Sequence, residues 1–167
     1  MKYLLLLLTL PLQCFGLTAD REKPIHIQAD NATVDEVTGT SIYRGNVIIE
    51  QGTLLINADE VEVRTADSEV IQIIASAETD STELAHYEQL PDDSEEKVYA
   101  DARKITYLVQ EERLHLTGDA RLKQLKDLFT GELLYYDVNQ GIVNLNSTGR
   151  PGDRIRMTLN PKKNKGN

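Results

Sequence analysis

The chain has very little cysteine and few aromatic side chains. Among its 167 residues there is one cysteine, Cys14, and there is no tryptophan, while 40% of the residues are hydrophobic. A single cysteine excludes an internal disulfide framework, so the hydrophobic core and the backbone hydrogen bonds must hold the fold together. The length and the hydrophobic fraction are sufficient for one domain with a sizeable core.

The chain also lacks a hydrophobic run long enough to span a bilayer, which requires about 20 residues. Its longest apolar run, at residues 4–10, follows Lys2 and ends in small or polar residues, which is the pattern of a secretory signal. We expect residues 1–16 to be removed by cleavage after Gly16, with cleavage after Ala19 as the second choice. No small residue precedes Cys14 directly, which argues against a lipid anchor there.

Basic residues are scarce. Eighteen Lys and Arg oppose 27 Asp and Glu, for a net charge of −9. This balance disfavours nucleic acid and bare anionic membrane as partners, because both would be repelled at long range. The only basic run lies at residues 162–165, and we interpret residues 161–167 as a disordered basic tail. One domain is expected over residues 17–160.

Signatures of catalysis are missing as well. His26, His86 and His115 have no metal-ligand spacing to one another, and the acidic run at 91–96 lacks the alternating pattern of a calcium loop. There is no phosphate-binding glycine loop and no nucleophile elbow. The sequence therefore predicts a protein that is not an enzyme, with no catalytic residue, no metal and no cofactor.

What the chain does have is an apolar period of two almost throughout. Ile25 and Ile27 alternate with polar residues, and the same pattern recurs up to Leu133 and Tyr135. Such alternation is typical of antiparallel strands with one buried face. Turn signals such as Gln51-Gly52 separate the runs, so the sequence predicts an all-β fold of roughly sixteen strands of about five residues. Residues 82–89 fit either a strand or a single helical turn.

An internal echo indicates two halves with the same strand order. Gly45-Asn46 is followed by Gln51 and Asp59, and Gly118-Asp119 is followed by Gln124 and Glu132 at the same offsets. Both glycines fit a bulge or a tight bend that curves a sheet. Upstream, the pairs Ala29-Asp30 and Ala100-Asp101 stand at similar distances from the two glycines.

Several of these segments resemble the signature of the OstA-like family. They are residues 24–30 (PIHIQAD), 43–47 (YRGNV), 51–53 (QGT) and 56–59 (INAD), with 104–109 (KITYLV) and 116–120 (LTGDA) for the second half. The resemblance implies a twisted antiparallel sheet folded as an open jelly roll (β-taco) with an apolar cleft. It also implies a periplasmic protein that binds lipopolysaccharide and carries it from the inner to the outer membrane, docking to membrane components with homologous jelly-roll domains.

On this basis the inward apolar residues are candidates for lining the lipid-binding cleft. They share the inward phase of their strands and are Ile25, Ile27, Val47, Ile49, Leu54, Ile56, Val61, Val63, Ile73, Ile105, Tyr107, Leu114, Leu116, Leu122, Leu133 and Tyr135. A closed core without lipid is the alternative, and it would fit a periplasmic scaffold or a glycan-binding jelly roll. The open sheet is also expected to leave unpaired end strands, near 25–29 and 154–159, which favours head-to-tail self-association.

Overall fold

The computed structural model describes residues 20–92, 94–150 and 153–160, and every regular element within them is a β-strand. The predicted all-β fold is therefore confirmed. No helix in these ranges is long and apolar enough to cross a membrane. The predicted signal peptide at 1–16 and the predicted tail at 161–167 lie outside the described residues.

Twelve strands occupy the described part of the chain, in two sets of six. The first set is β1 (His26–Gln28), β2 (Asn31–Asp35), β3 (Thr40–Gln51), β4 (Leu54–Ala66), β5 (Glu69–Ser76) and β6 (Ala85–Gln89). The second set is β7 (Val98–Ala102), β8 (Lys104–Leu108), β9 (Arg113–Gln124), β10 (Asp127–Asp137), β11 (Ile142–Asn146) and β12 (Arg156–Thr158). The ambiguous segment 82–89 thus contains a strand, β6.

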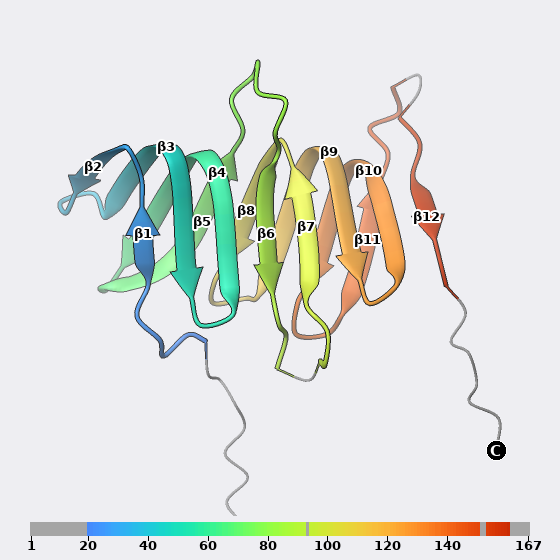
Figure 1. Cartoon of the computed structure of the whole chain (residues 1–167), viewed down its shortest axis with the longest axis horizontal. Coiled ribbons are helices and arrows are strands. Elements are labelled where there is room, and N and C mark those ends of the chain that lie inside the picture. Colours follow the sequence, from blue (N-terminus) through green and yellow to red (C-terminus); the bar gives the residue numbers. More distant parts are fainter. Residues whose placement is uncertain (1–19, 93, 151–152, 161–167) are drawn as a thin grey trace, which may run out of the picture.

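The prediction of roughly sixteen strands is wrong because four of the strands are long. β3, β4, β9 and β10 have 11 to 13 residues each and pass through the sites where the sequence suggested breaks. In Figure 1 these four strands turn over at the top edge of the molecule, which we call the seam. Each contributes one half to a front layer and the other half to a back layer.

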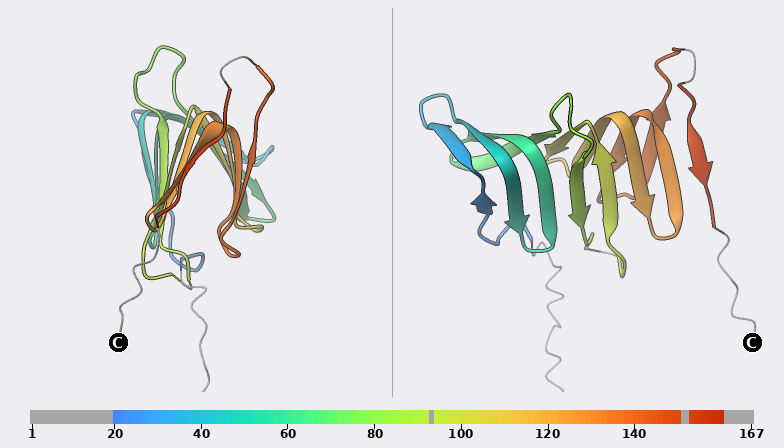
Figure 2. Two further views of the ribbon diagram at one scale, coloured as in Figure 1. Left: turned by 90° about the vertical axis from the view of Figure 1, so that its right-hand side faces the viewer. Right: turned by 45° about the horizontal axis from the view of Figure 1, so that its top comes forward.

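All strand pairs are antiparallel, and the two layers follow from the pairing. The front layer joins β1, β6, β7 and β12 to the halves of the long strands next to turns 51–54 and 124–127. The back layer joins β2, β5, β8 and β11 to the other halves. The layers meet at the seam and face one another below it (Figure 2, left). The edge opposite the seam, where the hairpin turns lie, is called the mouth.

The seam is made by two equivalent bulges. Between β3 and β4 the register shifts so that Gly45 and Asn46 stand opposite Asp59 alone. Gly118 and Asp119 stand in the same way opposite Glu132. Both glycines have φ of +78°, and both following residues also have positive φ, a conformation that glycine adopts at little cost. The internal echo therefore marks the two places where the sheet folds over.

Pairing shows that β1–β6 and β7–β12 are two copies of one unit. β1 and β2 pair with the two halves of β3 as β7 and β8 pair with those of β9. β5 and β6 pair with β4 as β11 and β12 pair with β10. The upstream part of the echo was aligned wrongly: Asp30 donates its N–H to the Gly45 carbonyl, and the residue that does this to Gly118 is Arg103, not Asp101.

Candidate binding cleft

The inward faces of both layers form one hydrophobic core. Because side chains alternate along each strand, every second residue of the front layer faces the back layer. Twelve of the predicted cleft residues are buried there: Val47, Ile49, Leu54, Ile56, Val61, Val63, Ile73, Ile105, Tyr107, Leu114, Leu116 and Leu122. Ile25 and Ile27 are partly buried and pack against this core at its N-terminal end. Whether these residues line a lipid-binding site stays a prediction.

Leu133 and Tyr135 are the exceptions, and their predicted inward phase is wrong. Their neighbours Leu134 and Tyr136 are the buried residues, at 0% and 1% exposure. Leu134 pairs with the inward Leu116, whereas Leu133 pairs with Thr117. The bulge in β9 shifts the phase of β10, because two residues of β9 stand opposite Glu132 alone: Phe129 is buried before this point, and Leu134, five residues later, is buried after it.

The core also holds residues that the sequence analysis did not select. Tyr87 is fully buried, and it lies opposite Ala100 on the neighbouring strand, with Ala85 opposite Ala102 beside it. Small alanines opposite large rings allow the two layers to approach and fill space evenly. The alternating pattern of residues 98–102 (VYADA) was the available signal, but alanine contributes weakly to a hydrophobic pattern.

Three tyrosines bring hydroxyl groups into this apolar interior. Burial raises the pKa of Tyr107 and the pKa of Tyr136 to about 12, and it raises the pKa of Tyr87 well above its usual value. The rings of Tyr87 and Tyr107 meet edge to face at 5.6 Å, and the Tyr87 hydroxyl donates to Gln89. The buried Tyr136 hydroxyl has no hydrogen-bond partner among the described residues. All three side chains are therefore neutral at physiological pH.

The mouth of the second unit is hollowed and polar. A pocket of about 420 Å³ lies between the front turn at Gln124 and Leu125, the back turn at 138–141 and the loop after β6. Tyr136 lines its inner end. The pocket thus connects the apolar interior to solvent on the side opposite the seam.

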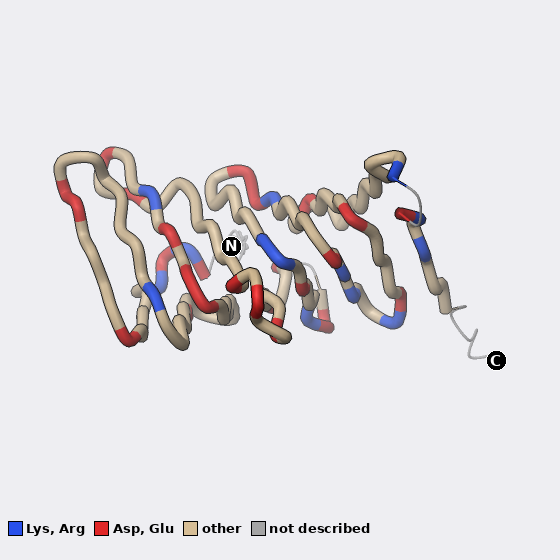
Figure 3. The backbone as a smooth tube through the Cα atoms, turned by 90° about the horizontal axis from the view of Figure 1, so that it is seen from above, with Lys and Arg blue, Asp and Glu red and all other residues tan. Residues whose placement is uncertain are grey.

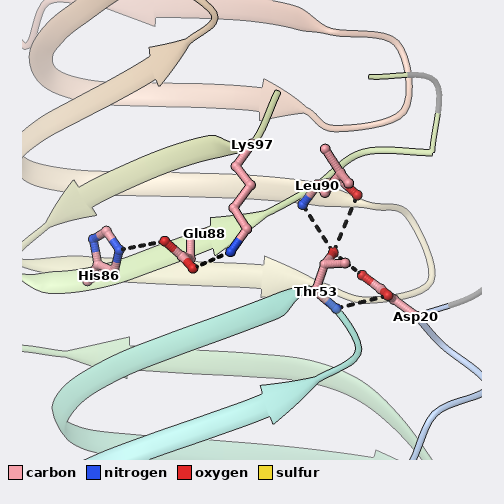
Figure 4. A network of polar contacts seen from close by, with 6 residues as sticks. All are labelled: Asp20, Thr53, His86, Glu88, Leu90 and Lys97. Atoms are coloured by element: carbon pink, nitrogen blue, oxygen red, sulfur yellow. Dashed lines mark hydrogen bonds and ion pairs between the residues drawn. The ribbon is translucent and has the colours of Figure 1, made fainter. Parts of the chain in front are cut away.

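The N-terminal segment crosses the mouth from the first unit to the second. Asp20 accepts hydrogen bonds from the backbone N–H and hydroxyl of Thr53, whose hydroxyl also accepts from the Leu90 N–H at 3.1 Å (Figure 4). Arg21 then forms an ion pair of 2.5 Å with Glu112, in the turn between β8 and β9. These contacts form a polar strap that joins the front and back layers below the core.

The outward histidines are not grouped with one another. His86 Nδ1 lies 2.8 Å from Asp101 on the paired strand, and this hydrogen bond is the largest cause that raises the pKa of His86. Partial burial lowers the pKa of His115, which packs edge to face on Tyr135. Within the described ranges no group of three or more His, Cys, Asp or Glu side chains is placed to hold a metal ion. The absence of a metal site stays a prediction.

The arrangement is thus two aliphatic inner faces that are joined at a seam, with a polar mouth opposite. Among the described residues, each end has two strands that are paired on one side only: β1 and β2 at one end, and β11 and β12 at the other. The described side chains include no convergent set of an acid, a base and a nucleophile within the interior, where the buried polar atoms belong to three tyrosines, Gln51 and Asn57. Such an interior can shelter apolar material from water.

Comparison with known proteins agrees with this geometry. The family described as "LptA/(LptD N-terminal domain) LPS transport protein" matches residues 26–142. The lipopolysaccharide export system protein LptH of Pseudomonas aeruginosa is 34% identical over 93% of this chain and 95% of its own. LptA of Escherichia coli K12 is 30% identical over 96% of this chain and 86% of its own. The crystal structure of P. aeruginosa LptH, titled as the periplasmic component of a lipopolysaccharide transport device, aligns with a TM-score of 0.75 at 31% identity, over 85% of this chain and 99% of that one.

Proposed function

Because the chain belongs to the LptA/LptD N-terminal domain family of lipopolysaccharide transport proteins, we propose that it is a periplasmic carrier of lipopolysaccharide between the inner and the outer membrane. The observation that carries the proposal is this family membership over nearly the whole chain. The role of the relatives is transport, which is not an enzymatic role.

The layered fold supports a way for acyl chains to enter. The front and back layers share ladder hydrogen bonds only within each layer, and the four long strands alone cross the seam. The layers can therefore part at the mouth without breaking strand pairs, as long as the polar strap of Asp20 and Arg21 yields. Acyl chains would then replace the contacts between the inner faces, and each methylene taken out of water is worth about 0.8 kcal/mol.

A crosslinking experiment tests the cleft with a matched control on one strand. A photoreactive residue in place of Ile27, which is inward on β1, should crosslink to purified lipopolysaccharide. The same residue in place of His26, which is outward on β1, should not. Equal crosslinking at both positions, or none at either, contradicts the proposal and favours a closed core.

The internal repeat further supports head-to-tail assembly. Within the chain, the first unit joins the second through β5 with β8 and β6 with β7. The strands equivalent to β5 and β6 at the C-terminal end are β11 and β12, and on one edge neither pairs with any residue that the structure describes. The strands equivalent to β8 and β7 at the N-terminal end are β2 and β1. A second copy that repeats the internal junction would pair β11 with β2 and β12 with β1.

The equivalence of the two units predicts which residues would stand opposite one another at that junction. Since Tyr87 stands opposite Ala100 and Ile73 opposite Tyr107 within the chain, Met157 would stand opposite Ile27 of the next copy, and Val143 opposite Val34. Met157 and Val34 are 52% and 59% exposed in the single chain. The junction would bury both side chains, and this burial would favour pairing of the edges. The same edges would dock homologous jelly-roll domains of the membrane components.

Cysteine pairing tests the register. The variant Met157→Cys, mixed with the variant Ile27→Cys, should form a mixed disulfide dimer under mild oxidation, because opposed strand positions lie within disulfide reach. Val37→Cys is a matched control, since Val37 is 97% exposed in the turn after β2 and has no opposite residue in this register. A dimer that forms as readily with the control would contradict the register.

A further inference from the structure

A groove lined by arginine lies on the outer face of the front layer, beside the second bulge. Its volume is about 680 Å³, and it is bordered by the loop before β6 and the loop before β12. Five of the chain's nine arginines line it: Arg103, Arg121, Arg150, Arg154 and Arg156. In the view from above the seam, the segments that carry Lys and Arg are blue, and several of them lie at the C-terminal end, in β12 and the loop before it (Figure 3). Basic residues are thus concentrated here in a chain whose net charge is −9.

The repeat provides an internal control for this groove. The equivalent place in the first unit is a smaller hollow of about 300 Å³, whose lining includes Asp59 and Glu83 and no basic residue. By strand register, Ile48 is the equivalent of Arg121 and His86 that of Arg156. The same backbone therefore folds without these arginines, so the fold alone does not require them.

The second unit also differs at two further positions. Leu84 precedes His86 by two residues, as Arg154 precedes Arg156, and both lie in the loops just before β6 and β12. Asp30, which donates its N–H to the first bulge, occupies the place of Arg103. At three aligned positions and at Arg154, then, arginine stands where the first unit has an apolar residue, a histidine or an acidic residue, and each difference makes the groove at least as positive.

The acids in the groove leave most of this positive charge available. Asp119 lies 3.4 Å from Arg103, and Asp153 accepts hydrogen bonds from the backbone and hydroxyl of Thr148. Glu132 is the third acid. Arg121, Arg154 and Arg156 are exposed and make no ion pair with any described residue. Five guanidinium groups therefore face three carboxylates, of which Asp119 pairs with Arg103 and Asp153 is already held by Thr148.

We propose that this groove binds a phosphorylated saccharide. Guanidinium groups present a planar pair of donors that matches the spacing of phosphate oxygens, so they form bidentate hydrogen bonds with phosphate. The volume is far larger than a phosphate ion needs and lies in the range of small-molecule sites. Its remaining lining, which includes Thr82, Thr130 and Thr148, offers hydroxyl groups rather than an apolar wall.

The groove is separate from the proposed lipid cleft. It lies next to the seam on the outer face, whereas the polar mouth lies at the opposite edge of the layers. A hydrophilic ligand bound there does not need the layers to part. The proposal therefore stands or falls independently of lipid capture, and it can be tested with water-soluble probes.

Isothermal titration with glucose 1,6-bisphosphate tests the proposal. We expect saturable binding of one molecule per chain that weakens with added salt. The double variant Arg121→Ile and Arg154→Leu installs the corresponding residues of the first unit. It should weaken binding at least about tenfold, because charge-assisted hydrogen bonds to the phosphates are lost. The control Arg44→Gln and Arg64→Gln removes the same charge from pairs with Glu60 and Glu62 and should leave binding unchanged.

Three outcomes would overturn the proposal. Equal loss of binding in both double variants would mean that only the overall charge matters. Inorganic phosphate that binds as tightly as glucose 1,6-bisphosphate would make the ligand a free phosphate ion. A polyglutamate peptide that binds while glucose 1,6-bisphosphate does not would make the groove a docking surface for an acidic protein.

Discussion

Adjacent leucines on β10 allow a sharp test of how the sheet folds over its core. Leu134 is fully buried and faces Leu116, whereas its neighbour Leu133 lies on the outer face, opposite Thr117. The two variants Leu134→Ala and Leu133→Ala delete the same atoms one residue apart. Any difference in the free energy of unfolding therefore reports which face each side chain occupies.

The magnitude follows from burial. Leu134 has 0% exposure, and truncating a buried leucine to alanine costs about 2–5 kcal/mol, more where the surroundings cannot collapse into the space. The two layers are linked at the seam and can close slightly, so we expect Leu134→Ala to cost about 3 kcal/mol. Leu133→Ala should cost less than about 1 kcal/mol, because a half-exposed side chain leaves no cavity.

Urea denaturation followed by circular dichroism measures both values in the same buffer. With about 2–4 °C per kcal/mol for a chain of this size, the melting temperature of Leu134→Ala should fall by about 6–12 °C. Equal losses, or a larger loss for Leu133→Ala, would show that the bulge does not shift the phase of β10. The inward assignment of Tyr136 would then be wrong as well.

Four further perturbations have defined outcomes. Gly118→Ala should cost about 1–3 kcal/mol in urea denaturation, because φ is +78° and a Cβ there would lie 2.9 Å from that of Arg103; an unchanged midpoint would refute this. The raised pKa of His86 implies stability that is fully present below its unfolded pKa and is lost as pH rises through the folded value, and Asp101→Asn should reduce this dependence in melting curves across that window. Truncation after Asn146 removes β12 and should give a monomer at all concentrations in sedimentation velocity, whereas the full chain should form longer species; rods from the truncated chain would contradict the junction. A chelator should leave the melting temperature unchanged, and a fall of several degrees would reveal a metal site.

Much of the fold was predictable because period-two alternation fixes both the strand class and the facing of each residue. Ile105 and Leu116 were placed inward from the pattern alone, and they face one another across β8 and β9. At residues 133–136 (LLYY) the alternation does not show which side chains face inward, because both alternating sets are equally apolar. Only the cross-strand partner of Leu134, which sequence alone does not reveal, decides which pair is buried.

The strand count failed for a related reason. Gly45 and Gly118 were read correctly as devices that curve the sheet, but a bulge bends a strand without ending its ladder. Arg44 still pairs with Glu60 before the bulge, and Val47 pairs with Ala58 after it. The arginine groove was not predictable at all, because its members come from the link between β7 and β8, from β9, from β12 and from the loop before β12, and only the folded repeat brings them together.

The repeat also separates what the fold needs from what function can change. Positions that pair one unit to the next stay apolar in both units: Tyr87 of β6 corresponds to Met157 of β12, and Ile73 of β5 to Val143 of β11. On the outer face near the bulges the two units differ: Arg121 of β9 stands at the position that Ile48 occupies in β3. Burial holds the first set fixed wherever a neighbouring unit must cover it, even at the chain's end, where the described residues provide no cover. The outer face has no such constraint, so packing does not account for the arginines that stand there in the second unit, whereas the phosphorylated ligand that we propose would account for them.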